Sequence, residues 1–196
     1  MKILQKNILL LLLALFAFAS CSETDDVAVD DTWAADNVAY TQAIAAEAHA
    51  NVAGDWKVIT PLGVDENKVW PDDGYVYCKV IKAGTSQGSP FYNDVVTVNY
   101  EGRLINDYVF DSTFFRELDF DAELNLDMGT PVELALDECV RGFVAALQEM
   151  VRGDVWRVYI PSALAYGADT ASGVPSNSML IFTVQLVDFK HNGETE

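Results

Sequence analysis

The residue types that most often ligate metals or act as nucleophiles are few in this chain and lie far apart. The two histidines, His49 and His191, stand towards opposite ends, and the three cysteines, Cys21, Cys78 and Cys139, show no Cys-x-x-Cys spacing. A structural zinc site needs four such ligands in a compact set. The sequence therefore predicts neither a metal nor another cofactor, and the candidate chemistry falls to aromatic and acidic side chains.

Aromatic residues recur inside five short motifs that are separated by turn residues. The motifs are residues 96–102 (VTVNYEG), 109–112 (VFDS), 140–143 (VRGF), 160–167 (IPSALAYG) and 180–186 (LIFTVQL). Each motif is common when it is taken alone. Their occurrence together in one order is much more specific.

In this order the five motifs resemble an FKBP domain, over a stretch from residue 71 to residue 190. Residues 75–84 (YVYCKVIKAG) also resemble the first strand and turn of that family. The resemblance implies the family's fold and its activity, peptidyl-prolyl cis/trans isomerisation of proline-containing polypeptide segments.

That reaction requires neither a nucleophile nor a metal. Amide resonance gives the X–Pro bond a rotation barrier of roughly 20 kcal/mol. The twisted amide has lost this resonance and is less dipolar than the planar amide, so an apolar pocket that excludes water favours it over the ground state. Aromatic walls are therefore a chemically sensible lining.

By resemblance, the catalytic set is Tyr100, Phe110, Asp111, Val140, Phe143, Tyr166 and Phe182. The proline ring would sit on Phe143, with the other aromatic residues as walls. The N–H of Val140 and the hydroxyl of Tyr166 would donate hydrogen bonds to substrate carbonyls. Asp111 would orient polar groups around the twisted carbonyl, although alone it also suits a turn-capping role.

Further substrate contacts are implied for four residues, Val132, Cys139, Ala165 and Val174. Three features depart from the family pattern. The floor is usually Trp and here is Phe143, the loop 168–178 lacks the common histidine, and Val132 stands where an aromatic wall is usual. Substrate preference is thus the least transferable property.

The stretch 112–131 is longer than in minimal family members. Its aromatic residues Phe114, Phe115 and Phe120 are candidates to replace the wall missing at Val132, or to lengthen a substrate groove. The alternative is a surface loop without a role in binding.

Several strands and one helix must position these residues. Short β-type runs separated by turns predict strands at 75–82, 95–103, 108–111, 132–136, 155–160 and 180–189. A helix is predicted over 140–151, ended by Gly153, with Val140, Phe143, Val144, Leu147 and Val151 as its buried stripe. The fold class is α+β, an antiparallel sheet wrapped around one short helix.

Cys78 lies in the first of these strands and Cys139 directly before the helix. Nothing in their placement brings the two thiols together. We expect two buried thiols and no disulfide, even in an oxidising compartment.

Before this domain the sequence predicts a helix over 32–53, capped by Asp31 or Thr32 and closed by Gly54. Trp33, Tyr40, Ile44, Ala48 and Val52 fall near helical spacing. The helix either packs on the following domain or serves as an arm that dimerises or gathers substrate. A short strand at 56–60 and a linker over 61–73 follow.

The start of the chain is typical of an exported lipoprotein. Two lysines precede an apolar run at 8–18, too short to span a bilayer stably, and Ala19-Ser20-Cys21 resembles a bacterial lipobox. Cys21 would then carry the lipid, and the acidic segment after it would be a flexible tether. The expected location is the cell envelope, as an outer-membrane lipoprotein facing the periplasm or the surface. The alternative is ordinary cleavage.

These features divide the chain into a signal peptide (1–20), a tether (21–31), a helical extension with linker (32–70), the FKBP-type domain (71–190) and a polar tail (191–196). The formal charge is -18. Such a surface repels phosphate backbones, so nucleic acid is excluded as a partner.

Three functions remain open at this point. The first is a folding enzyme for exported proteins. The second is a catalytically silent chaperone or binding module, motivated by the changes at Phe143 and Val132. The third is an adhesin or assembly subunit of the envelope that keeps the fold only as a scaffold.

Overall fold

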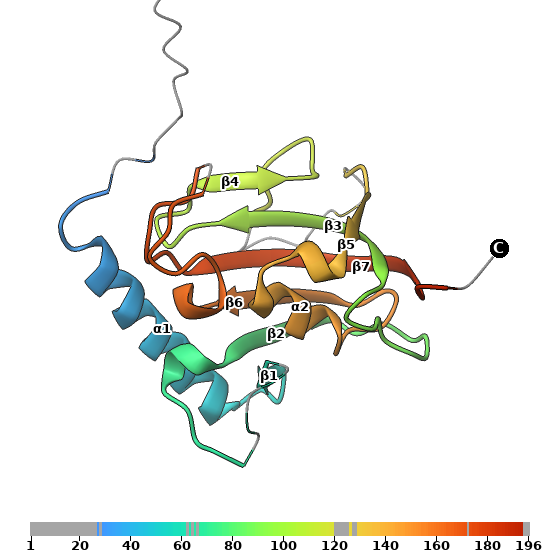
Figure 1. Cartoon of the computed structure of the whole chain (residues 1–196), viewed down its shortest axis with the longest axis horizontal. Coiled ribbons are helices and arrows are strands. Elements are labelled where there is room, and N and C mark those ends of the chain that lie inside the picture. The colour runs from blue at the N-terminus through green and yellow to red at the C-terminus, as the bar shows by residue number, and fades with distance from the viewer. Residues whose placement is uncertain are drawn as a thin grey trace, which may run out of the picture.

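The computed structural model describes residues 27–193 except 28, 62, 64, 66, 120–125, 127, 128 and 172. Within this part of the chain, seven strands form one antiparallel sheet (Figure 1). Their order is β1-β2-β6-β7-β3-β4, and β5 also pairs with β3. The strands are β1 (Trp56–Ile59), β2 (Val76–Lys82), β3 (Val95–Arg103), β4 (Val109–Ser112), β5 (Val132–Ala135), β6 (Val155–Ile160) and β7 (Leu180–Lys190).

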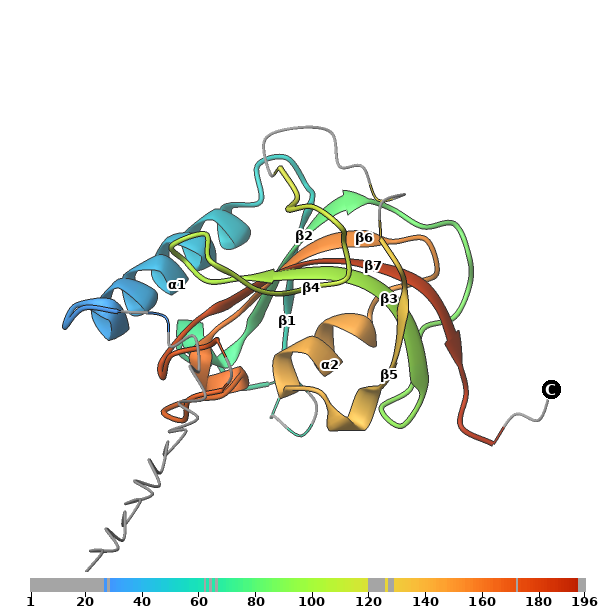
Figure 2. The same cartoon turned by 90° about the horizontal axis from the view of Figure 1, so that it is seen from above.

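In the described ranges, two α-helices cover the sheet from opposite sides. They are α1 (Trp33–Ala50) and α2 (Arg141–Leu147), with short 3-10 helices η1 (Asp72–Gly74), η3 (Leu136–Glu138) and η4 (Ser162–Leu164) between strands. Figure 2 shows α2 under the curve of the sheet and α1 outside it. The predicted α+β class with a sheet wrapped on a short helix is confirmed.

Burial along β7 follows from this two-sided cover. Phe182, Val184 and Leu186 pack in the main core with α2, whereas Ile181 packs in a second cluster with Ile44 of α1. The alternating residues of β7 therefore point to two buried faces, and not to one buried face and one face exposed to solvent.

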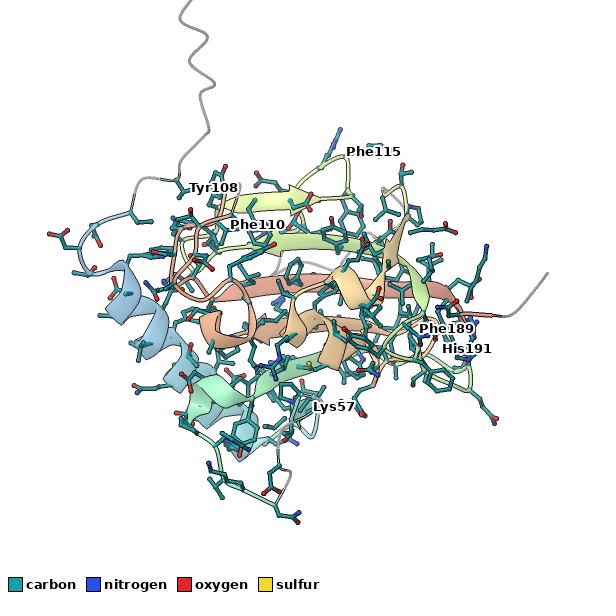
Figure 3. All side chains as sticks on the ribbon, viewed as in Figure 1. Lys57, Tyr108, Phe110, Phe115, Phe189 and His191 are labelled. Atoms are coloured by element: carbon teal, nitrogen blue, oxygen red, sulfur yellow. The ribbon has the colours of Figure 1, made fainter. Side chains whose placement is uncertain are left out.

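The predicted strands are confirmed, and those at 95–103 and 155–160 have the predicted bounds. The segment from 56 forms β1, which pairs with β2. Its Lys57, labelled in Figure 3, holds its ammonium 5.1 Å from the ring centroid of Trp156. Part of the expected N-terminal extension thus contributes to the sheet itself, while the domain boundary at residue 71 stays a prediction.

The helix predicted over 140–151 is shorter than expected. Helix α2 ends at Leu147, and the N–H groups of Glu149 and Met150 then bond three residues back, at 3.1 and 3.2 Å. The Asp154 carboxylate accepts the Val151 N–H at 2.7 Å, which draws that residue out of the helix. Consequently Met150, not Val151, is fully buried.

The N-terminal helix also ends earlier than predicted. Asn51 adopts the left-handed conformation at φ 39°, and its side chain bonds both the N–H and the carbonyl of Trp56. Asn can take this conformation at modest cost, so it ends the helix three residues before Gly54. Val52 lies beyond that end and is 96% exposed, so its assignment to the apolar stripe was wrong.

The cysteines of the domain are not bonded to each other, as predicted. Cys78 is buried in β2 and Cys139 is half-buried. Burial raises the pKa of the Cys78 thiol well above its ordinary value. It therefore behaves as a small apolar residue of the core.

The predicted signal peptide, Cys21 and nearly all of the acidic tether lie outside the described residues. Val27, near the end of that tether, packs against the main core. No helix in the described part of the chain is long and apolar enough to cross a membrane.

A buried carboxylate fastens the end of β7 to the loop before β3. Asp94 accepts backbone N–H groups of Phe91 at 2.6 Å and Asn192 at 2.9 Å, and its Oδ2 lies 2.6 Å from Nδ1 of His191. The ring of Phe91 stacks on His191 at 4.4 Å, and Phe189 meets the same ring edge-on. Figure 3 labels His191 and Phe189 at this end of the sheet.

Asp94 links stability to pH. Burial acts to raise the pKa of this carboxyl, but the two backbone N–H groups and His191 outweigh it and hold the pKa below its ordinary value. A carboxyl whose pKa is lower in the folded than in the unfolded state contributes stability above the unfolded pKa of about 3.9. That stability is lost as the pH falls through the folded pKa.

We therefore expect Asp94→Asn to lower the free energy of unfolding at pH 7 by about 1–3 kcal/mol. The loss should begin to shrink below about pH 4, where the carboxyl of the unfolded chain takes up a proton, and should shrink further as the pH falls through the lowered pKa of the folded carboxyl. Urea unfolding at pH 7 and at about pH 2.5 measures both effects. Asp73→Asn, at an exposed position, is the control and should change stability by less than about 0.5 kcal/mol. An equal loss at both pH values would contradict the role of the charge.

Candidate active site

A recess of about 260 Å³ opens between the sheet and α2. It is smaller than the ~300–1,000 Å³ typical of small-molecule pockets. Side chains from β3, β4, β5, β7, the start of α2 and the turn after η4 line it. The lining residues are Tyr100, Phe110, Asp111, Leu134, Glu138, Cys139, Val140, Phe143, Tyr166 and Phe182.

Phe182 is the centre of the aromatic lining. Its ring centroid lies 5.0 Å from that of Phe143, 5.5 Å from Phe110 and 6.0 Å from Tyr100. The contacts with Phe110 and Tyr100 are edge-on, which is a favoured arrangement for aromatic pairs. Phe143 and Phe182 are 4% and 8% exposed, so the floor of the recess is apolar and packed into the core.

Gly102 makes room for this cluster. It lies directly opposite Phe182 in the β3–β7 pairing, and Phe110 folds over it from β4. A Cβ on Gly102 would lie 2.4 Å from Cζ of Phe110 and 2.9 Å from Cε1 of Phe182. The glycine is thus required by the close approach of two rings.

At one rim the hydroxyl of Tyr100 donates a 2.5 Å hydrogen bond to Oδ2 of Asp111. Burial, and then the bond and charge of Asp111, raise the pKa of Tyr100 well above its ordinary value. Tyr100 therefore stays protonated, and its O–H keeps the carboxylate in one orientation. Asp111 of β4 is thus oriented by Tyr100 of the neighbouring strand β3. A carboxylate that only capped a turn would not need a hydrogen bond from another strand.

Two donors face the recess without a partner. The N–H of Val140 and the hydroxyl of Tyr166 donate no hydrogen bond to a described residue. Tyr166 is 41% exposed. Its turn is fixed by the N–H of Gly167, which donates to the Ser162 carbonyl at 2.8 Å, and by the Asn177 N–H, which donates to the Gly167 carbonyl at 2.7 Å.

The recess offers no activated nucleophile among its described groups. Burial, and then the carboxylates of Glu138 and Asp137, raise the pKa of the Cys139 thiol. A protonated thiol is a poor nucleophile and a poor metal ligand. No group of three His, Cys, Asp or Glu side chains in the described ranges is placed to hold a metal ion. The chemistry open to the recess is packing and hydrogen bonding.

The structure brings all seven residues of the expected catalytic set, together with Cys139, to this one recess. The other expected contacts are not among its lining residues: Val174 is buried, and Val132 and Ala165 are half-buried against the core. Leu134 and Glu138 were missed. Leu134 was open to prediction, because it lies two residues after Val132 on the same face of the strand.

The phenylalanines of the 112–131 stretch do not line the recess. Phe114 is buried in a bridge with Gly129, and Phe115 is 75% exposed and points away from the sheet (Figure 3). Phe120 lies outside the described residues. Of the three candidates for the wall missing at Val132, neither Phe114 nor Phe115 lines the recess, whereas Leu134, on the same strand as Val132, does.

The described part of the chain thus combines a sheet wrapped on a short helix with an aromatic recess and two donors that have no described partner. The sequence pattern of the family described as "FKBP-type peptidyl-prolyl cis-trans isomerase" matches residues 87–187, just over half of the chain. The chain belongs to this family, as its ordered motifs predicted.

Two curated relatives and one solved structure show the range of similarity. A peptidyl-prolyl cis-trans isomerase Mip of Coxiella burnetii is 44% identical over 113 residues, 57% of this chain and 44% of the relative. A macrophage infectivity potentiator of Trypanosoma cruzi is 32% identical over 144 residues, 70% of this chain and 67% of the relative.

The solved structure is a peptidyl-prolyl cis-trans isomerase of Pseudomonas syringae, with TM-score 0.58 and 23% identity. The match covers 84% of this chain and 100% of that one, and it concerns the fold alone. This chain spans less than half the length of the Coxiella relative.

Gly102→Ala should displace Phe110 from the recess, because a flexible ring yields more easily than two paired strands. We expect binding of a Phe-Pro tetrapeptide, followed by NMR titration, to weaken about tenfold, with a stability cost of about 1–3 kcal/mol. Phe110→Leu is the matched variant. If Gly102→Ala acts through Phe110, the double variant should bind about as weakly as Phe110→Leu alone. Fully additive losses would contradict this mechanism.

Proposed function

We propose that this chain accelerates cis/trans isomerisation of X–Pro bonds in proline-containing segments of exported proteins, and so assists their folding. The observation that carries the proposal is the gathering of Tyr100, Phe143, Tyr166 and Phe182 around one recess that also holds two unpartnered donors. Spontaneous isomerisation takes tens to hundreds of seconds, which makes it a slow step in folding.

The proposed mechanism is selective stabilisation of the twisted amide. The proline ring packs on Phe143 and Phe182, where water is excluded and the planar, more dipolar amide is disfavoured. The Val140 N–H and the Tyr166 hydroxyl donate to the carbonyls on either side of the bond and hold the twisted geometry. Asp111, oriented by Tyr100, sits where the rotating carbonyl passes.

Several features support this reading over a silent binding module. The Coxiella relative is named a peptidyl-prolyl cis-trans isomerase, and the match covers less than half of that protein. Phe143 keeps an apolar floor without an indole N–H, so we expect catalysis to persist with altered affinity. Leu134, on the same strand as Val132, adds an apolar side chain to the lining.

The test uses residues 22–196 and a Phe-Pro tetrapeptide, with exchange rates measured by NMR. We expect clear acceleration by the wild type. Tyr166→Phe removes one donor and should lower kcat/KM about 3- to 10-fold, and Asp111→Ala should lower it as well.

Tyr92→Phe is the matched control, because its hydroxyl is exposed outside the recess, and it should leave the rate unchanged. Wild-type rates equal to those without protein would exclude catalysis. If the wild type then still binds the peptide, a catalytically silent chaperone or binding module is favoured. If it does not bind the peptide either, an envelope subunit that keeps the fold only as a scaffold is favoured.

We further propose that Cys21 carries a lipid that anchors the protein in the bacterial envelope, periplasmic or surface-exposed, with residues 22–31 as its tether. The lipobox-like Ala19-Ser20-Cys21 and the acidic segment after it support this location. A homodimer through α1 would need the outward face of that helix, because Ile44, Ala45 and Ala48 pack in the cluster beneath it.

Cys21→Ser should abolish lipid attachment. In the native host grown with radiolabelled palmitate, we expect the wild type to carry label and to fractionate with membranes, and the variant to do neither. Cys78→Ser controls for labelling of internal thiols and should keep both properties. Unlabelled wild-type protein released into the soluble envelope fraction would favour ordinary cleavage instead.

A further inference from the structure

The N-terminal helix lies outside the family match at 87–187, yet its first residue belongs to the main core. Trp33 packs in the same cluster as Leu164, Val174 and Phe182. Val174 lies in the segment 173–179 between η4 and β7, called the lip here because its Gly173 approaches Phe110 of the recess, and Leu164 ends η4, two residues before Tyr166. An element from beyond the family match therefore reaches the segments that border the site.

Buried hydrogen bonds tie α1 to the end of this lip. Nε1 of Trp33 donates to Oγ of Ser178 at 3.1 Å, and the Met179 N–H donates to Oδ1 of Asn37 at 2.7 Å. The Asn37 amide in turn donates to the Trp33 carbonyl at 2.8 Å. All four residues are buried, with Asn37 and Ser178 each 3% exposed.

The held segment leads directly to the recess. Ser178 donates to the Pro175 carbonyl at 2.6 Å, and the Asn177 N–H donates to the carbonyl of Gly167, next to Tyr166. On the other side, a Cβ at Gly173 would come within 3.5 Å of Cβ of Phe110. Residues 173–179 thus connect α1 with the turn that carries Tyr166 and with one aromatic wall.

A buried amide is a specific device, because a polar group in the core is stable only when its hydrogen bonds are made. The side-chain N–H of Asn37 donates within α1, and its Oδ1 accepts from the lip. Both bonds form only when the helix and the lip pack in one relative position. Thr41, one turn further on the same face, bonds only to the Asn37 carbonyl of its own helix, at 2.8 Å. It is buried to a similar degree and does not hold the lip.

We propose that Asn37 and Trp33 are positioning residues of the isomerase site: they fix the 173–179 segment and, through it, the Tyr166 hydroxyl. This role rests on the proposed function for its catalytic consequence but not for its structural one. Helix α1 is then a working part of the site rather than only an arm.

The test compares Asn37→Leu and the milder Ser178→Ala with Thr41→Val in the 22–196 protein. We expect Asn37→Leu to lower kcat/KM on the Phe-Pro peptide about 5- to 10-fold and Ser178→Ala about 2- to 3-fold. Thr41→Val should shift the urea midpoint by a similar amount and leave kcat/KM unchanged. Amide NMR signals of Tyr166, Gly167 and Val174 should move in the first two variants only.

The two proposals fail in distinguishable ways. Wild-type kcat/KM and unmoved Tyr166 signals in Asn37→Leu, beside a slowed Tyr166→Phe, would overturn the positioning role and leave the isomerase intact. If the wild type does not catalyse isomerisation but the Tyr166 signals still move in Asn37→Leu, the positioning of Tyr166 by Asn37 stands and the proposed isomerase function is excluded. If Asn37→Leu does not fold, Ser178→Ala decides, and equal effects in Ser178→Ala and Thr41→Val would count against the proposal.

Discussion

The pairing of β3 with β7 is the interaction on which the rest of the structure depends. All nine residues of β3 have partners on β7, and its other edge pairs with β4 near one end and β5 near the other. Gly102 therefore faces Phe182 while β4 lays Phe110 over both. A slip by one residue would turn Tyr100 away from α2 and reverse every side chain of the strand.

This pairing also creates a second demand, because it buries β7 on two sides. From Leu180 to Val184 the strand has no exposed residue, so apolar cover is needed outside the curve as well as under it. Helix α2 supplies the inner cover and α1 the outer one. The family match begins after α1, β1 and β2, so in this chain the outer cover comes from segments that the match does not include.

Residue patterns predicted what depends on local order and missed what depends on distant partners. The strands follow from two-residue alternation, and Gly102 and Tyr166 follow from short motifs. Helix α2 ends early because Asp154 captures an N–H, a competition that periodicity does not reveal. The bond between Asn37 and Met179 joins residues 142 apart, so it has no local signal at all.

Long-range electrostatic attraction dominates at the surface of the chain, whereas apolar packing and hydrogen bonding dominate inside the recess. The chain carries a formal charge of -18, which attracts basic segments of unfolded polypeptides over distances of about a Debye length. Inside the recess, burial keeps Tyr100 and Cys139 protonated at neutral pH, so contact there depends on apolar packing and on directed N–H and O–H donors. Because X–Pro rotation moves no proton and creates no ion, a recess with few charges is the better match to its transition state. In the proposed function, acidic groups at the surface can therefore attract basic substrate segments without disturbing the rotation.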